Sequence, residues 1–167
     1  AGADGVVLCD TNGGCLPHEI YAITRTVVEQ VGIRVGIHVH NDAGMAVATT
    51  LEAVRAGATQ MQGTMNGFGE RCGNANLVTL IPNVALKLGL PCGNPKNLPK
   101  LRELSNFVYE LVNVRPDPRA PYVGQSAFSH KAGPHVNAVQ KNPVTFEHVA
   151  PETVGNERHI LVSELSG

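Results

Sequence analysis

The sequence has 167 residues, of which 43% are hydrophobic, and a formal net charge of −1. This length and composition exclude extended disorder and predict one domain with a core, with room for an appendage. The balanced charge, and the lack of any apolar stretch long enough to cross a bilayer, predict a protein that binds neither nucleic acid nor a membrane.

Three strand-helix units in series are predicted for residues 1–90. Each unit has a short apolar run followed by apolar residues at helical spacing, which is the pattern of a buried parallel strand and its crossover helix. Pro82 lies inside the third helical pattern, so we expect that helix to kink or to be short. Such units imply a parallel sheet with right-handed crossovers. The predicted strands cover residues 5–11, 34–40 and 60–65, and the helices that follow them end at Gly32, Gly57 and Gly89.

A change of composition over residues 90–97, which are rich in Pro, Gly and Asn, indicates a domain boundary. A helix is predicted over residues 98–112. Residues 115–121 contain three prolines, so we expect an extended connector there. One last short strand is predicted at residues 160–162. The buried face of the helix is predicted to consist of Leu101, Leu104, Val108 and Leu111.

Two histidines of the second strand, His38 and His40, are candidates for a metal site. Alternate residues of a strand point to the same face, so both imidazoles converge, and Asn74 adds an amide oxygen near the neighbouring strand. Parallel α/β sheets bind ligands at this carboxyl edge. Mixed nitrogen and oxygen ligands suit a divalent ion. Two histidines that only form hydrogen bonds at a polar strand tip fit the spacing equally well.

Polar residues beside these strand tips allow both a functional and a structural interpretation. Asp10 and Thr11 either hold a substrate carboxylate, for which Thr11 is the better donor, or satisfy the backbone at the strand end. Asp42 either orients the imidazoles or caps the next helix. Glu70 and Arg71 are either a positioning pair or a structural ion pair.

The second region has its own candidates, His130 and His135, in a stretch dense in proton-transferring groups. Each is a candidate general acid or base, and each fits a histidine of the core or of a loop equally well. They lie outside the strand-helix units, so we do not expect them to be metal ligands of the same set.

The cysteines indicate the cellular compartment of the protein, and the first residue indicates whether the chain is part of a longer one. The four cysteines show no CxxC spacing and no pairing pattern, so neither a zinc ribbon nor a disulfide framework is predicted, and a reducing cytoplasm fits best. Cys72 is expected to be a small buried residue. The chain has no initiator Met, and we expect it to be part of a longer protein.

Four segments of the chain resemble the isopropylmalate, homocitrate and citramalate synthases, which are acetyl-CoA-dependent Claisen condensing enzymes of the DRE-TIM metallolyase superfamily. The resemblance extends over essentially the whole chain. It implies an α/β fold in which residues 1–90 are the last three βα units of a (β/α)8 TIM barrel. A small, mostly helical linker subdomain would follow in residues 91–167, the whole being a fragment of a longer chain. The four segments are residues 10–14, 38–42, 63–74 and 127–135.

Within this group the chain most resembles the citramalate synthases, which join pyruvate to acetyl-CoA on a route to isoleucine. The resemblance therefore implies a cytoplasmic, metal-dependent acyltransferase that condenses acetyl-CoA with a 2-oxo acid and is a homodimer at full length. The 2-isopropylmalate synthases of leucine biosynthesis are the nearest alternative. Residues 9–14, 120–124 and 161–167 carry the closer resemblance.

The resemblance also implies how the site works. His38, His40 and Asn74 would be the ligands of a divalent ion, Mg, Mn or Zn. The ion would chelate the 2-oxo acid as a Lewis acid, and Thr11 would contact the substrate carboxylate, with Asp10 as a second substrate-binding residue. Acetyl-CoA would be the co-substrate, and no residue of this chain is assigned to it.

His135 would serve in acid-base chemistry, with Glu70 as a supporting group. In relatives the segment that carries this histidine reaches over the barrel of the partner subunit. Relatives also have a fourth ligand, an aspartate on the first strand, and an acidic residue on a middle strand, which this chain cannot supply. Phe146 stands where relatives often have a tyrosine that helps the proton transfers, so we expect either lower activity or water in that role.

Two further hypotheses differ in class. A lyase or carboxyltransferase on the same barrel would share the histidine pair, but the acyl-CoA lyases have no counterpart to the segment from His130 to His135. An inactive, truncated barrel fragment would act only as a binding or association module.

Overall fold

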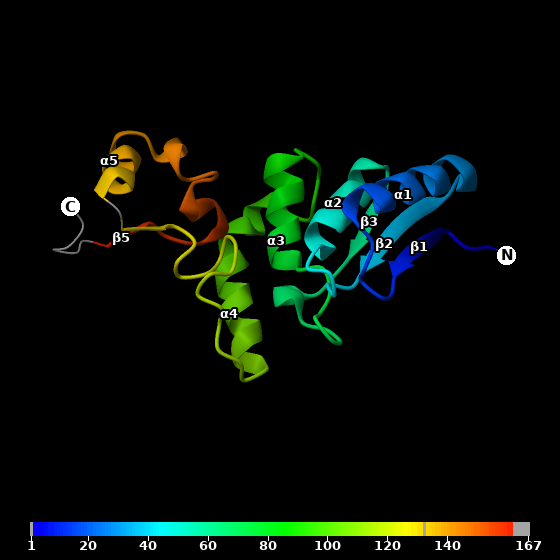
Figure 1. Ribbon diagram of the computed structural model, residues 1–167, viewed down its shortest axis with the longest axis horizontal. Coiled ribbons are helices and arrows are strands. Elements are labelled where there is room, and N and C mark those ends of the chain that lie inside the picture. Colours follow the sequence, from blue (N-terminus) through cyan, green and yellow to red (C-terminus); the bar gives the residue numbers. More distant parts are fainter. Residues whose placement is uncertain (1, 132, 162–167) are drawn as a thin grey trace. The chain divides into compact units, whose positions relative to one another are not determined.

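The computed structural model describes residues 2–131 and 133–161 (Figure 1). The chain divides into two compact units, Ala1–Leu90 and Pro91–Gly167, which we call the first and the second unit. Residues 162–167, which include the end of the predicted last strand and most of one segment of the family resemblance, lie outside the described residues.

The first unit is built on a parallel three-stranded sheet in the order β1-β2-β3, as predicted. Strand β2 is central and pairs Cys9 of β1 with His38, and His38 with Gln62 of β3. Its alternate residues Ile37 and Val39 are almost completely buried. The strands are β1 (Gly5–Asp10), β2 (Arg34–Val39) and β3 (Gln60–Gln62).

The third strand is shorter than predicted, because the chain leaves the sheet at Gly63 and turns into a 3-10 helix, Met65–Gly67. A side chain at Gly63 would clash with the carbonyl oxygen of Ala75, so the chain passes closely over the segment that leads into the next helix. The segment that follows β3 is therefore a tight loop, and it carries Asn74.

Three helices follow the strands, and α1 and α2 pack side by side against the sheet (Figure 1). Helix α1 begins with Pro17 in its first turn and stops at Gly32, which has the left-handed φ of 59° that suits a C-terminal glycine. The Asn76 side chain caps α3, which ends at Pro82, and a π-helical turn, Asn83–Lys87, continues the chain. The helices are α1 (Pro17–Val31), α2 (Ala46–Arg55) and α3 (Leu77–Pro82).

The core of the first unit lies between the sheet and these helices. Small alanines of α2 and its flanks let that helix approach the branched side chains of β2 closely, which gives dense packing. Burying these apolar side chains supplies the main stabilisation of the unit. The buried cluster consists of Ile20, Ile37, Val39, Ala46, Ala53, Ala58, Ala75 and Leu80.

The regular elements of the second unit are mainly helices, with one two-stranded parallel pair, β4 (Ser129–His130) and β5 (His159–Ile160). Three 3-10 helices each begin with proline, whose fixed φ suits a first helical position. Within the described residues of both units, no helix is long and apolar enough to span a bilayer. The helices are Pro95–Lys100 (3-10), α4 (Leu101–Leu111), α5 (Gly133–Lys141), Pro143–Thr145 (3-10) and Pro151–Val154 (3-10).

The predicted buried face of the helix over residues 98–112 is wrong in part. Leu101 is buried, but the other buried positions of α4 are Ser105 and Tyr109, while Leu104 and Leu111 are 43% and 67% exposed. Apolar periodicity identifies a stripe on a helix but not the side on which the rest of the unit packs. The helix also starts later than predicted, because the segment with Pro95 and Pro99 is a 3-10 helix.

Candidate metal and substrate site

Strand β2 and the residue after it bring two imidazoles together at the carboxyl edge of the sheet. The rings of His38 and His40 are 5.4 Å apart between centroids, with their planes at 70°. Both side chains are half-buried, whereas Val39 between them is 1% exposed and packs in the core. The alternation of side chains along a strand thus explains why the two histidines meet.

Asn74 joins this pair from the loop after β3. Its Nδ2 lies 3.2 Å from Nε2 of His38, and its backbone forms an isolated antiparallel bridge with His40. The flanking backbone holds it in place, because Asn41 N donates to Gly73 O at 2.9 Å and Ala75 N donates to Val39 O at 3.1 Å. The structure therefore brings together all three predicted metal ligands.

Glycines make this approach of the loop possible. A side chain at Gly69 would clash with Oδ1 of Asn74. Gly73 has a φ of +89°, and a side chain there would clash with the carbonyl of Gly67. Both positions need the absence of a Cβ, so the Gly-rich composition of residues 63–74 serves to place Asn74.

The donor set of this cluster fits a divalent cation. Nδ1 of His38 and Nδ1 of His40 are buried and lack a hydrogen-bond partner in the described structure, which costs about 1–3 kcal/mol for each group that stays unsatisfied. Asn74 would offer its amide oxygen to such a cation, since carbonyl oxygens and not amide nitrogens bind divalent ions. Within residues 2–131 and 133–161 there is no cluster of three or more His, Cys, Asp or Glu that could hold a metal ion.

Arg71 ties three loops of this edge together. Its Nε and Nη2 donate to the two carboxylate oxygens of Asp42 at 2.7 and 2.9 Å, and Nη2 also donates to the carbonyl oxygen of Thr11 at 2.8 Å. The hydrogen bonds from Arg71 hold the pKa of Asp42 below its ordinary value, and the same contact raises the pKa of Arg71. The ion partner of Arg71 is Asp42, so the alternative of a structural ion pair between Glu70 and Arg71 is wrong.

Asp42 also does not cap α2. The amide of Ala46, the first residue of that helix, donates to Oδ1 of Asn41 at 3.1 Å. Asp42 is turned towards Arg71, because a side-chain charge 29 residues away competes with the local cap. Cys72, expected to be buried, is exposed in the same loop.

Asp10 and Thr11 lie at the tip of β1 and differ in how far their side chains are available to a ligand. The buried carboxylate of Asp10 accepts hydrogen bonds from the amides of Gly13 and Cys15, both at 3.1 Å, so it holds the loop after β1. Thr11 is exposed on that loop. A cavity of about 630 Å³ lies beside β1 and α1. Asp10, Thr11 and Arg71 are among the residues that line it, whereas His38, His40 and Asn74 are not. Thr11 is therefore the better placed of the two to meet a ligand there.

The remaining predicted site residues, Glu70 and His135, lie in different units. Glu70 is exposed in the loop before Asn74. His135 is exposed in α5, and its ring centroid lies 4.3 Å from that of Phe146 at an interplanar angle of 32°. The roles of Glu70 and His135 in proton transfer remain predictions.

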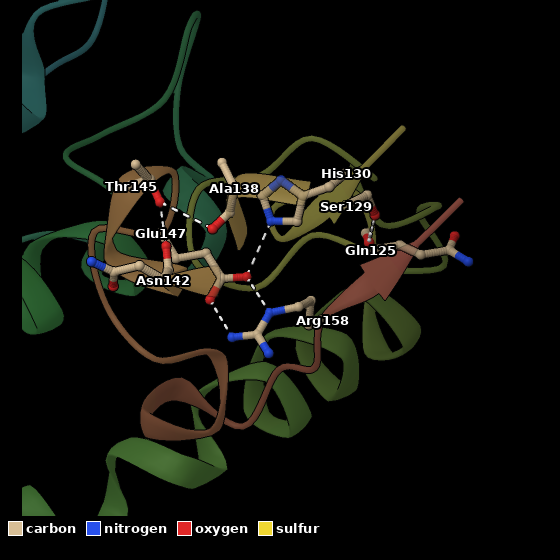
Figure 2. A network of polar contacts seen from close by, with 8 residues as sticks. All are labelled: Gln125, Ser129, His130, Ala138, Asn142, Thr145, Glu147 and Arg158. Atoms are coloured by element: carbon tan, nitrogen blue, oxygen red, sulfur yellow. Dashed lines mark hydrogen bonds and ion pairs between the residues drawn. The ribbon is translucent and has the colours of Figure 1, made fainter. Parts of the chain in front are cut away.

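His130 lies in a buried polar network that sequence reasoning did not find. Its Nε2 is 3.1 Å from a carboxylate oxygen of Glu147, which is also paired with Arg158 (Figure 2). His130 is thus a buried histidine in contact with a carboxylate. No periodic signal could have identified its partners, because they are 17 and 28 residues away on irregular segments.

Comparisons with known proteins support the same family over both units. The HMGL-like family model matches residues 1–108, and the model of the homocitrate synthase post-HMGL domain matches residues 122–167. A solved HMG-CoA lyase from Acenitobacter baumannii, in complex with coenzyme A and 3-methylmalate, is 25% identical with a TM-score of 0.59, covering 71% of this chain and 41% of that chain.

Curated relatives distinguish two activities within one organism. An (R)-citramalate synthase from Sulfolobus acidocaldarius is 55% identical and covers 100% of this chain and 32% of that protein. A 2-isopropylmalate synthase from the same organism is 40% identical and covers 100% of this chain and 43% of that protein. The chain thus spans about a third of the length of the citramalate synthases that it matches.

Proposed function

Because the chain belongs to the HMGL-like family, we propose that it is the carboxy-terminal part of the catalytic region of a citramalate synthase. The whole enzyme would condense acetyl-CoA with pyruvate. The observation that carries this choice is the higher identity to the citramalate synthase than to the isopropylmalate synthase of one organism, 55% against 40% over the whole chain.

The architecture supports a partial barrel. Three parallel strands cannot close a barrel, and the apolar residues Val6, Val7 and Leu8 of the edge strand β1 are only half-buried. Further strands that pair with the sheet would cover this edge. We propose that the first unit is the last three βα units of a (β/α)8 barrel, that the second unit is the linker subdomain, and that the enzyme is a homodimer.

In this proposal His38, His40 and Asn74 hold a divalent cation, Mg, Mn or Zn. The bound cation would supply Lewis acidity towards the carbonyl of the 2-oxo acid. Thr11 would donate a hydrogen bond to the substrate carboxylate from the tip of β1. Asp10 would act on the substrate through the loop that it holds.

His135 is the proposed acid-base residue, with Glu70 in support. A base removes a proton from the methyl group of acetyl-CoA, and the resulting carbanion forms the new carbon-carbon bond at the keto carbon of pyruvate. The former carbonyl oxygen takes up a proton, and water then cleaves the thioester to release CoA and citramalate. An imidazole suits both proton transfers, because its ordinary pKa lies near neutral pH.

The test is a CoA-release assay on the full-length protein that contains this chain. Acetyl-CoA is offered with pyruvate, 2-oxoisovalerate or 2-oxoglutarate, with and without a chelator. We expect chelator-sensitive release that is fastest with pyruvate. A preference for 2-oxoisovalerate would instead indicate a 2-isopropylmalate synthase, and no release with any 2-oxo acid in the presence of metal would refute a condensing enzyme.

A further inference from the structure

The second unit has a deeply buried charge, the carboxylate of Glu147, whose side chain is 2% exposed. Arg158 donates to it from Nε and from Nη2, both at 2.6 Å, and Nε2 of His130 lies 3.1 Å away (Figure 2). Arginine fits a carboxylate with two parallel hydrogen bonds, which fix orientation as well as distance. The carboxylate of Glu147 is therefore fixed in place by its partners.

Both partners of Glu147 come from one small element. His130 lies in β4, Arg158 directly precedes β5, and the two strands pair with His130 opposite Ile160. The hydrogen bonds from Arg158 lower the pKa of Glu147 against the effect of burial, so the carboxylate stays ionised at neutral pH. A buried ion that is fully hydrogen-bonded anchors its segment, because any displacement would leave a charge unpaired.

The residue on the other side of Phe146 is anchored as well. The hydroxyl of Thr145 has two possible acceptors for its one hydrogen, the carbonyl of Ala138 at 3.4 Å and the carbonyl of Asn142, both near the end of α5 (Figure 2). Phe146 thus lies between a residue tied to α5 and a residue tied to the β4-β5 pair.

Phe146 itself is not fixed by burial. Its side chain is 47% exposed, yet its ring lies against the ring of His135. His135 is near the start of α5, the helix that Thr145 also contacts. An exposed imidazole on a helix surface samples several rotamers. The Phe146 ring lies on one face of the imidazole and restricts the rotamers that His135 can adopt. The position of Phe146 therefore decides how well His135 is oriented.

We propose that Glu147, paired with Arg158 and His130, is a positioning residue that fixes Phe146 against His135 and so orients that imidazole. This inference rests on the proposed function, in which His135 transfers protons. Proton transfer depends steeply on the placement of the transferring atom, so a network that touches no substrate still affects the rate. Arg158 carries the larger share, because it makes two short contacts whereas His130 makes one.

The test measures the orientation of His135 without relying on activity. The full-length protein is labelled with 13C at histidine Cε1, the His135 signal is assigned with His135→Asn, and Phe146→Leu defines the signal without the aromatic ring current. In Glu147→Gln we expect the His135 signal to move towards its position in Phe146→Leu. The matched control is Glu157→Gln, an exposed neighbouring carboxylate with a 3.4 Å contact to Arg102, which should leave the signal in place.

The kinetic arm of the experiment uses the same variants. Glu147→Gln should lower kcat by about tenfold, with KM for pyruvate changed by less than about twofold, because orientation and not binding is lost. If Glu147→Gln does not fold, Arg158→Lys keeps the charge but removes the two-pronged contact and should shift the His135 signal in the same direction.

The outcomes separate the two proposals. An unmoved His135 signal in Glu147→Gln and in Arg158→Lys, with a moved signal in Phe146→Leu, would overturn the positioning role whatever the activity. If the wild-type protein releases no CoA, the proposed function fails, while the histidine signals still show whether Glu147 orients His135.

Discussion

The two units hold their polar groups in opposite ways. In the first unit the sheet edge presents His38 and His40, whose buried Nδ1 atoms lack a partner, together with Asn74. In the second unit the buried carboxylate of Glu147 has its hydrogen bonds filled by Arg158 and His130. Groups with unfilled capacity are ready for a ligand, whereas a filled network is a support. In our proposals the first unit therefore binds the ligand, and the second unit positions a side chain.

The largest expected effect comes from removing a ligand of the first unit. His38→Ala should reduce metal-dependent CoA release of the full-length protein by more than about a hundredfold, because one of the three proposed ligands is lost. The melting temperature should change little, since His38 forms one side-chain hydrogen bond at the edge of the core. His18→Ala, an exposed histidine of α1, is the control. Full metal-dependent turnover in His38→Ala would contradict the binding role that we propose for the first unit.

For the buried network around Glu147 we expect an effect on the stability of the protein and on the pH dependence of that stability. Glu147→Gln should lower the free energy of unfolding at pH 7 by about 2–4 kcal/mol, because Arg158 then lacks its buried charge partner. The pKa of Glu147 lies below its ordinary value of 4.5, so its stabilisation is present above that pH and is lost as the pH falls through the lower, folded-state value.

Denaturant titrations between pH 7 and pH 3 measure this effect. The stability difference between the wild type and Glu147→Gln should be constant at neutral pH and shrink at acid pH. A difference that grows on acidification would contradict the assigned direction of the pKa shift.

The glycine loop gives a smaller effect that tests how the first unit builds its site. Gly73 and Gly89 both have positive φ, but only at Gly73 would a side chain clash with the backbone, at Gly67. Gly73→Ala should therefore cost about 1–3 kcal/mol more than Gly89→Ala and should also weaken metal binding. Isothermal titration with Mn and thermal unfolding measure the two effects. Equal behaviour of the two variants would show that the close approach of the loop is not needed.

The smallest effect is expected at the ion pair that joins the loops. Arg71→Gln should raise KM for pyruvate by about three- to tenfold with a smaller change in kcat, because Thr11 loses the contact that holds its backbone. Arg25→Gln removes an exposed pair within α1 and serves as the control, with no change in either constant. Steady-state kinetics on the full-length protein would show whether Arg71 supports substrate binding by Thr11. An unchanged KM would show that Thr11 does not need the contact with Arg71.

Local patterns of the sequence were enough for the parallel sheet and for the histidine pair. The side-chain period of a strand places His38 beside His40, and Gly32 and Pro17 mark the ends of α1, without any knowledge of distant residues. The order of the strands in a repeated strand-helix chain also follows from general rules of connection.

What the tertiary structure alone decided depends on residues far apart in the chain. Arg71 forms its ion pair with Asp42 and not with its neighbour Glu70, because which charges meet depends on how loops fold over the sheet edge. The side of α4 that is buried differs from the apolar stripe, since packing of the whole unit selects the face.

The network around Glu147 is another feature that only the tertiary structure decided. Its partners His130 and Arg158 carry no spacing signal, and they meet because β4 and β5 pair. The sequence by itself determined what has a local period, namely the strands, most helix ends and the pair of imidazoles. Only the tertiary structure decided which charges are buried together, because the pairing of a buried charge depends on contacts that close over long stretches of chain.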